Sequence, residues 1–130
     1  MTEEKEEENV QEYKIDAESE LRFEVEGSKE KVTIELKSGL AEIFGAELVK
    51  NRKFTFGSGA KVAVFTWHGC TLELSGKTEV AYVAKETPMI FYANIHAVLE
   101  QMRHKSEEDD TKGPTVTFSL FFHYWNFHKC

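Results

Sequence analysis

Apolar and polar residues alternate with a period of two through the middle of the chain. In residues 20–25 (ELRFEV) apolar side chains alternate strictly with charged ones, and the same period recurs within 32–36, 54–56 and 72–74. Successive side chains of a β-strand point to opposite faces, so this period predicts strands that are buried on one face and solvated on the other.

Two further segments are predicted as strands from their composition. Lys61–Trp67 (KVAVFTW) is apolar on both faces and rich in β-branched and aromatic residues, which favours a central strand, and Val80–Ala84 is a second such segment. Gly and Ser residues separate the strands at short intervals. Gly45 interrupts the apolar run LAEIFGAELV, which indicates a turn or bulge between two short strands. Together these patterns predict a mostly β fold, a small β-sandwich of about seven or eight antiparallel strands.

The period changes after Pro88. Four apolar residues follow the i, i+3, i+4, i+7 spacing of one helical stripe: Ile95, Val98, Leu99 and Met102. Asn94 is a suitable N-cap, so the spacing predicts one C-terminal helix over residues 94–105. Gly113-Pro114 ends any helix that reaches it.

The formal net charge of −7 is concentrated in two short segments. Residues 1–12 carry a net charge of −5 and residues 105–112 (KSEEDDTK) one of −2, so the rest of the chain is neutral. A basic surface of the kind that binds nucleic acid is therefore not predicted. We interpret the two acidic runs as solvated, flexible segments.

These patterns divide the chain into four parts. Residues 1–12 are expected to be an acidic, disordered N-terminus, 13–92 the β-sandwich domain, 93–112 the helix and an acidic linker, and 113–130 an aromatic tail. The last 16 residues hold six of the 16 aromatic side chains and a single charged residue, Lys129. Such a run is prone to aggregate when exposed, so we expect it either to pack on the sandwich or to be unselected sequence.

Overall composition limits the class of protein. Of the 130 residues, 41% are hydrophobic and 30% are charged, which predicts one globular core and excludes a wholly disordered chain. No run of about 18 apolar residues is present, so neither a membrane-spanning helix nor a membrane partner is expected. The start MTEEKEEEN lacks the apolar segment of a secretory signal, and we expect a reducing compartment without a disulfide scaffold.

Two groups of His and Cys residues suggest chemistry, and each has a simpler interpretation. His123, His128 and Cys130 lie close together in the tail, but zinc takes four ligands and no second pair stands at a suitable spacing. His68 and Cys70 suggest a Cys–His nucleophile, but Cys70 follows a predicted buried strand. A reactive thiolate needs an exposed, electropositive environment, so we favour an unreactive buried thiol.

Phosphate-binding signals are weak. Lys50, Arg52 and Lys53 form a small basic loop that has the charge to contact a phosphate backbone, but without interleaved aromatic residues surface charge is the simpler interpretation. Gly57–Lys61 (GSGAK) lacks the spacer and the Gly-Lys-Ser/Thr ending of a phosphate-binding loop, and we interpret it as a hairpin turn.

Four segments carry a resemblance to a known family: ESELRFEVE (18–26), SGLAEIFGAEL (38–48), the long run 53–89 and AVLEQMR (97–103). In combination, AEIFG, KVAVFTWHGC and TEVAYV are highly specific. The chain resembles the N-terminal domain of the eukaryotic polyribonucleotide 5′-hydroxyl-kinase family, the Clp kinases of pre-mRNA cleavage factor II. The resemblance covers about residues 13–116.

This resemblance implies a nucleotide-binding role. In the family, the N-terminal β-sandwich packs against a P-loop domain and closes over the base of bound ATP. The family residues that contact the nucleotide correspond here to Glu20 and Lys61. A carboxylate accepts a hydrogen bond from an exocyclic amine, and an ammonium donates to a ring nitrogen or sugar oxygen. Without the resemblance, both are ordinary solvent-facing strand residues, and no catalytic or metal-binding residue is expected in the chain.

The resemblance also implies a biological setting. Full-length members are ATP-dependent kinases that act in the nucleus in pre-mRNA 3′-end cleavage and polyadenylation and in tRNA splicing. Their partners are the cleavage factor II scaffold, the tRNA-splicing endonuclease and RNA.

The chain departs from the family after Gly113-Pro114, where members continue into a P-loop and this sequence continues into its aromatic tail. We therefore expect a truncated product that is inactive alone. Its ATP site is incomplete, its magnesium site is absent, and the surface that faces the kinase domain is exposed. Alternatives are a non-catalytic interaction module or a non-functional truncated isoform.

Overall fold

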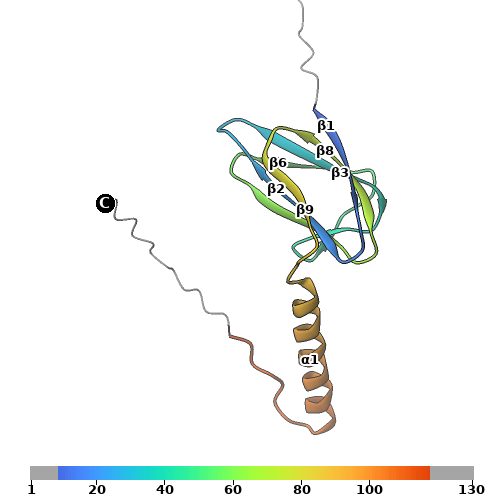
Figure 1. Cartoon of the computed structure of the whole chain (residues 1–130). Coiled ribbons are helices and arrows are strands. Elements are labelled where there is room, and N and C mark those ends of the chain that lie inside the picture. Colours follow the sequence, from blue (N-terminus) through green and yellow to red (C-terminus); the bar gives the residue numbers. More distant parts are fainter. Residues whose placement is uncertain (1–8, 118–130) are drawn as a thin grey trace, which may run out of the picture. The chain divides into compact units, whose positions relative to one another are not determined.

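The computed structural model describes residues 9–117, and that part of the chain contains nine strands and one helix (Figure 1). The chain divides into two compact units, Met1–Thr87 with all of these strands and Pro88–Cys130 with the helix. The elements are β1 (Val10–Ile15), β2 (Ser19–Val25), β3 (Lys31–Gly39), β4 (Glu42–Ile43), β5 (Ala46–Glu47), β6 (Lys53–Gly57), β7 (Lys61–Thr66), β8 (Cys70–Gly76), β9 (Thr78–Ala84) and α1 (Met89–Glu108).

The strands form two antiparallel sheets that face each other (Figure 1). Sheet 1 has the order β1-β8-β3-β6, and sheet 2 has the order β5-β4-β7-β2-β9. The predicted β-sandwich followed by one helix is confirmed, and β7 is central in sheet 2 as its two apolar faces predict. The strand count exceeds the prediction because β1, which the sequence pattern did not reveal, adds a ninth strand.

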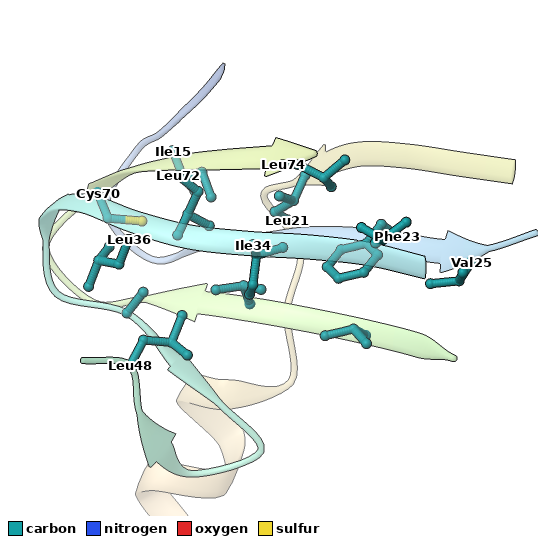
Figure 2. Close-up of a cluster of buried hydrophobic side chains, with 14 residues drawn as sticks. Ile15, Leu21, Phe23, Val25, Ile34, Leu36, Leu48, Cys70, Leu72 and Leu74 are labelled. Atoms are coloured by element: carbon teal, nitrogen blue, oxygen red, sulfur yellow. The ribbon is translucent and has the colours of Figure 1, made fainter. Parts of the chain in front are cut away.

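The core lies between the two sheets and consists of the apolar positions of the period-two pattern. Figure 2 shows side chains from both layers meeting there, with Leu21 and Phe23 from β2 and Leu72 and Leu74 from β8. All four are at most 1% exposed. Each fully buried side chain of this size stabilises the fold by about 1.5–3 kcal/mol relative to an exposed one, so the alternation determines which face of each strand points inward.

The predicted N-terminal boundary was wrong. Residues 1–12 were expected to be disordered, but Val10 begins β1, which pairs with β8 in the register Val10↔Ser75 to Ile15↔Cys70. In this edge strand only Ile15 is buried, so its apolar signal is too sparse to reveal a strand. Its stability comes from main-chain pairing with β8, from buried Ile15 and from partly buried Tyr13, which packs against the core. Residues 1–8 lie outside the described part.

The helix begins earlier than predicted. It runs from Met89 with Pro88 as N-cap, whereas the prediction placed Asn94 as the cap and the domain boundary at residue 93. Proline has a φ suited to the start of a helix and lacks an N–H that would need a partner there. Pro88 has φ −74° and makes no side-chain cap hydrogen bond. Asn94 therefore lies inside the helix. None of the described helical residues is buried.

The turn predicted at Gly45 is confirmed. β4 and β5 pair through Ile43↔Ala46, and the two residues between them, Phe44 and Gly45, have φ of +49° and +82°. Positive φ at both central positions is the signature of a type I′ turn, whose twist matches that of antiparallel strands.

Close backbone packing occurs where β3 ends beside the start of β8. Gly39 has φ +79° and pairs with Cys70. A Cβ at this position would lie 2.8 Å from the Cys70 Cα and would also overlap the Gly69 carbonyl oxygen. The neighbouring Thr66 hydroxyl donates to the Leu40 carbonyl at 2.7 Å and accepts from the Gly69 N–H at 2.9 Å. This corner has no space for a side chain on Gly39.

We expect Gly39→Ala to lower the free energy of unfolding by about 1–3 kcal/mol, because the left-handed backbone and the overlap with Gly69 both oppose a Cβ. Urea unfolding followed by tryptophan fluorescence measures the change. Gly57→Ala is the matched control, since a Cβ there meets nothing within 4 Å. Equal stability of the two variants would contradict this account of the corner.

Candidate functional site

The outward face of sheet 2 carries both sequence-predicted site residues. In the antiparallel register, Glu20 of β2 pairs with Phe65 of β7, and Glu24 pairs with Lys61. Directly opposed residues of paired strands share a face, so Glu20, Glu24 and Lys61 lie on the same side of sheet 2. Glu24 is four positions after Glu20, which places Glu20 roughly 13 Å along the strand from Lys61. The carboxylate beside Lys61 is therefore that of Glu24.

Glu20 is held by a neighbouring arginine. Its side chain is 6% exposed, and its Oε1 accepts a hydrogen bond from Arg22 Nε at 2.5 Å. Arg22 Nη2 forms an ion pair with the same oxygen at 2.5 Å. Arg22 Nη2 also donates to the Glu86 carbonyl at 2.9 Å. Hydrogen bonds to Tyr82 and to Glu20 raise the pKa of Arg22, so the guanidinium stays charged. The buried carboxylate thus has a fixed cationic partner within the fold.

Lys61 is placed differently. Its side chain is 75% exposed, and its Nζ lies 3.0 Å from Glu24 Oε2. Exposed ion pairs of this kind contribute about 0–1 kcal/mol, so exchanging Glu24 for another partner costs little. Lys61 can therefore reorient toward a ligand, whereas a ligand at Glu20 would have to compete with Arg22.

A groove of about 210 Å³ lies on this face of sheet 2 and includes Lys61 in its lining. The other lining residues that matter for chemistry are Arg22, Glu24, Phe44, Ala63 and Tyr82. We call this feature the sheet 2 groove. Two cations, one carboxylate and two aromatic rings surround a small residue, a combination that suits a planar ligand with both acceptor and donor atoms. Glu20 is not among the lining residues, so the structure brings only one of the two predicted residues to the groove.

Sequence reasoning missed Arg22, Phe44 and Tyr82. Arg22 and Tyr82 directly oppose each other in the β2–β9 pairing, which joins segments that are far apart in the sequence. Phe44 had one local signal, an aromatic residue beside a turn glycine in AEIFG, but that signal equally fits a core residue.

The second notable cavity is lined by Trp67, His68, Glu42 and Glu47 and has a volume of about 350 Å³. Trp67 packs edge-on against Phe65 with ring centroids 4.7 Å apart. The candidate metal ligands of the tail, His123, His128 and Cys130, lie outside the described residues. Within residues 9–117, no cluster of three or more His, Cys, Asp or Glu side chains suits a metal ion.

Cys70 is buried at the start of β8, which confirms the prediction of a buried thiol. Burial raises the pKa of the Cys70 thiol, and a hydrogen bond with Thr66 opposes this shift only in part. A protonated, buried thiol is a poor nucleophile at neutral pH. The structure therefore gives no support to a Cys–His nucleophile at residues 68–70.

The basic loop is a surface feature of the first unit. Lys50, Arg52 and Lys53 are exposed, and the guanidinium of Arg52 lies 5.5 Å from the ring centroid of Phe54. Among the described residues, no helix is both long enough and apolar enough to cross a membrane.

These features define a small β-sandwich domain with a polar and aromatic groove on one sheet. Residues 14–106 match the model of the N-terminal β-sandwich domain of polyadenylation factor, and the chain belongs to this family. The resemblance to Clp kinases drawn from the sequence is thereby confirmed.

Relatives and solved structures agree with this assignment. The chain is 59% identical over 111 residues to polyribonucleotide 5′-hydroxyl-kinase Clp1 of Gallus gallus, covering 85% of this chain and 26% of the relative. It is 61% identical over 104 residues to the same kinase of Bos taurus, covering 80% of this chain and 24% of the relative. Clp1p in the wild-type Clp1p–Pcf11p complex shares the fold, with a TM-score of 0.66, 23% identity, and coverage of 82% of this chain and 24% of that one. The chain thus spans about a quarter of the length of these proteins.

We expect Arg22→Ala to lower the free energy of unfolding by about 1–3 kcal/mol, because it leaves the buried Glu20 carboxylate without its donors. Lys61→Ala is the matched control on the same face and should change stability by less than about 0.5 kcal/mol. Adding Glu20→Gln to Arg22→Ala should recover part of the loss, since no buried charge remains. Urea unfolding of the four variants, including the single Glu20→Gln change, measures these differences, and a neutral Arg22→Ala would contradict the role assigned to the pair.

We expect the Cys70 thiol to react with a disulfide reagent at least about tenfold more slowly in the native chain than in concentrated guanidinium chloride. The measurement uses Cys130→Ser, so that only Cys70 reports, with a variant lacking both thiols as the blank. Because its folded pKa is raised, the thiol's contribution to stability is complete below its unfolded pKa. It is lost as pH rises through the raised folded pKa, so unfolding should become easier at alkaline pH. Rapid labelling of the native chain would contradict the assignment of Cys70 as a buried, protonated thiol.

Proposed function

We propose that this chain is the nucleotide-contacting N-terminal domain of an ATP-dependent polyribonucleotide 5′-hydroxyl kinase. The observation that carries the proposal is the match of residues 14–106 to the family domain. The sheet 2 groove supports it, because exposed Lys61 and the aromatic rings of Phe44 and Tyr82 suit a nucleobase. Lys61 is the residue proposed to contact the base directly. Glu20 contacts the base only if its ion pair with Arg22 opens. Otherwise it contributes to the site by holding Arg22 at the groove.

The proposed setting is that of the family. The domain would act in the nucleus, in pre-mRNA 3′-end cleavage and polyadenylation and in tRNA splicing, together with the cleavage factor II scaffold, the tRNA-splicing endonuclease and RNA. The solved structures that share its fold are complexes of Clp1p with Pcf11p, which is consistent with a partner of the cleavage factor II type.

Catalysis would require parts that these 130 residues do not contain. No P-loop motif GxxxxGK[ST] is present in the sequence. Phosphoryl transfer depends on positioning and on charge neutralisation at the triphosphate, which the P-loop and magnesium supply. The proposed role of this chain is therefore to hold the base, while a kinase domain holds the phosphates and carries out the reaction.

We expect the isolated chain to bind ATP only at millimolar or weaker affinity, about −4 kcal/mol, since few side chains contact the base and none cradles the triphosphate. Isothermal titration calorimetry should detect no binding in the micromolar range, and an RNA 5′-phosphorylation assay should show no turnover. A full-length Clp1 kinase is the positive control for both measurements. A micromolar dissociation constant or phosphoryl transfer by the isolated chain would overturn this division of roles.

A second candidate function is a non-catalytic interaction module, and the exposed apolar stripe of α1 favours it. The stripe consists of Phe91, Ile95, Val98 and Met102, each of them exposed. If the module acts by self-association, size-exclusion chromatography with light scattering should show a concentration-dependent dimer. A monomer at all concentrations would exclude self-association. A non-functional isoform is the remaining alternative, and detection in cells of a peptide spanning residues 114–129 tests whether the protein exists.

A further inference from the structure

Phe44 combines two unfavourable properties in one residue. It is 79% exposed, the most exposed large apolar side chain of residues 9–117, and its φ is +49°. The first central position of a type I′ turn favours asparagine, aspartate or glycine, because a side chain with a Cβ is disfavoured at positive φ and a large apolar one gains nothing there. Neither the positive φ of a phenylalanine in this turn nor the exposure of its ring stabilises the hairpin.

Core packing does not account for Phe44 either. The neighbouring Ile43 anchors the β4–β5 hairpin, since it packs against the core cluster and pairs with Val64 of β7. Gly45 supplies the second left-handed residue of the turn. Because Ile43 anchors the hairpin and Gly45 permits the turn, the fold does not require a phenylalanine at position 44.

The position of Phe44 at the sheet 2 groove indicates a role in ligand binding. It lines the sheet 2 groove from the β4 side, and Tyr82 lines it from β9. β7 and β2 lie between these strands, and they contribute Ala63 and Arg22 to the groove. Aromatic side chains beside an open floor and next to cations are the usual platform on which nucleobases stack.

We propose that Phe44 is the residue on which the nucleotide base stacks in the sheet 2 groove, with Lys61 as its hydrogen-bonding neighbour. This proposal rests on the proposed function and adds a residue to it. On this proposal, the exposed ring on a strained backbone contributes to ligand binding and lowers the stability of the hairpin. Strained backbone at binding sites commonly has this origin.

The test is an NMR titration of the whole chain with ATP, with inorganic tripolyphosphate as the probe that lacks a base. Affinity is taken from the initial slope of the chemical-shift change against ligand concentration. In the wild-type chain, ATP should shift the amide signals of the groove strands. Phe44→Ala should weaken ATP binding at least about fivefold, as expected for loss of one stacking partner, and Phe44→Trp should retain it. The chemical-shift changes caused by tripolyphosphate should be equal in all variants.

Phe44→Asn separates a binding role from a structural one. It places Asn-Gly in the type I′ turn, so urea unfolding should show equal or higher stability, while ATP binding weakens as in Phe44→Ala. Val49→Ala, an exposed apolar residue outside the groove lining, is the matched control and should change neither quantity.

The outcomes distinguish this inference from the function on which it rests. If ATP shifts the groove signals but Phe44→Ala and Phe44→Asn bind as the wild type does, the stacking role is overturned and the nucleotide-contacting function stands. If Phe44→Asn destabilises the fold, Phe44 is a structural residue and the inference is overturned. If ATP shifts no groove signal in the wild-type chain even at saturating concentration, the proposed function fails and the stacking role fails with it.

Discussion

The register of β2 between β7 and β9 is the constraint on which the rest of the structure depends. Leu21 and Phe23 point into the core, and burying them fixes which residues of β7 and β9 lie opposite. Because side chains alternate between faces, a slip of one residue would exchange the core positions with Glu20 and Arg22, at a cost of several kcal/mol. The same burial that stabilises the sandwich therefore determines which polar side chains gather on the outward face of sheet 2.

That outward face contains two electrostatic environments a short distance apart. At one end a nearly buried carboxylate, Glu20, is held by the guanidinium of Arg22, whose raised pKa keeps it charged. At the other end Lys61 and Glu24 form an exposed, weak pair. A nearly buried carboxylate resists loss of its partner because the charge would be left without solvation, whereas an exposed pair exchanges partners at little cost. This difference assigns direct ligand contact to Lys61 and a supporting role to Glu20.

Local patterns in the sequence account for much of the fold. The period-two alternation predicted the sandwich, Gly45 predicted the β4–β5 turn, and the strand before Cys70 predicted its burial. Other features depend on distant partners or on subtler local signals. β1 is defined by pairing with β8 and has one buried residue, Ile15, so its own pattern is weak. The helix starts at Met89, five residues before Asn94, because Pro88 suits the start of a helix without any side-chain hydrogen bond.

The candidate site shows the same division. By itself, the sequence determined the family, since specific motifs are local properties of the chain, and the resemblance to that family implied the candidates Glu20 and Lys61. Only the tertiary structure decided that Glu20 forms an ion pair with Arg22 and that Lys61 forms one with Glu24. It also decided that Phe44 and Tyr82 line one groove. Phe44 comes from the β4–β5 turn, Lys61 from β7 and Tyr82 from β9, and their approach depends on cross-strand register. Register is set by burial of the opposite face of the sheet, a collective property that no short segment of sequence contains.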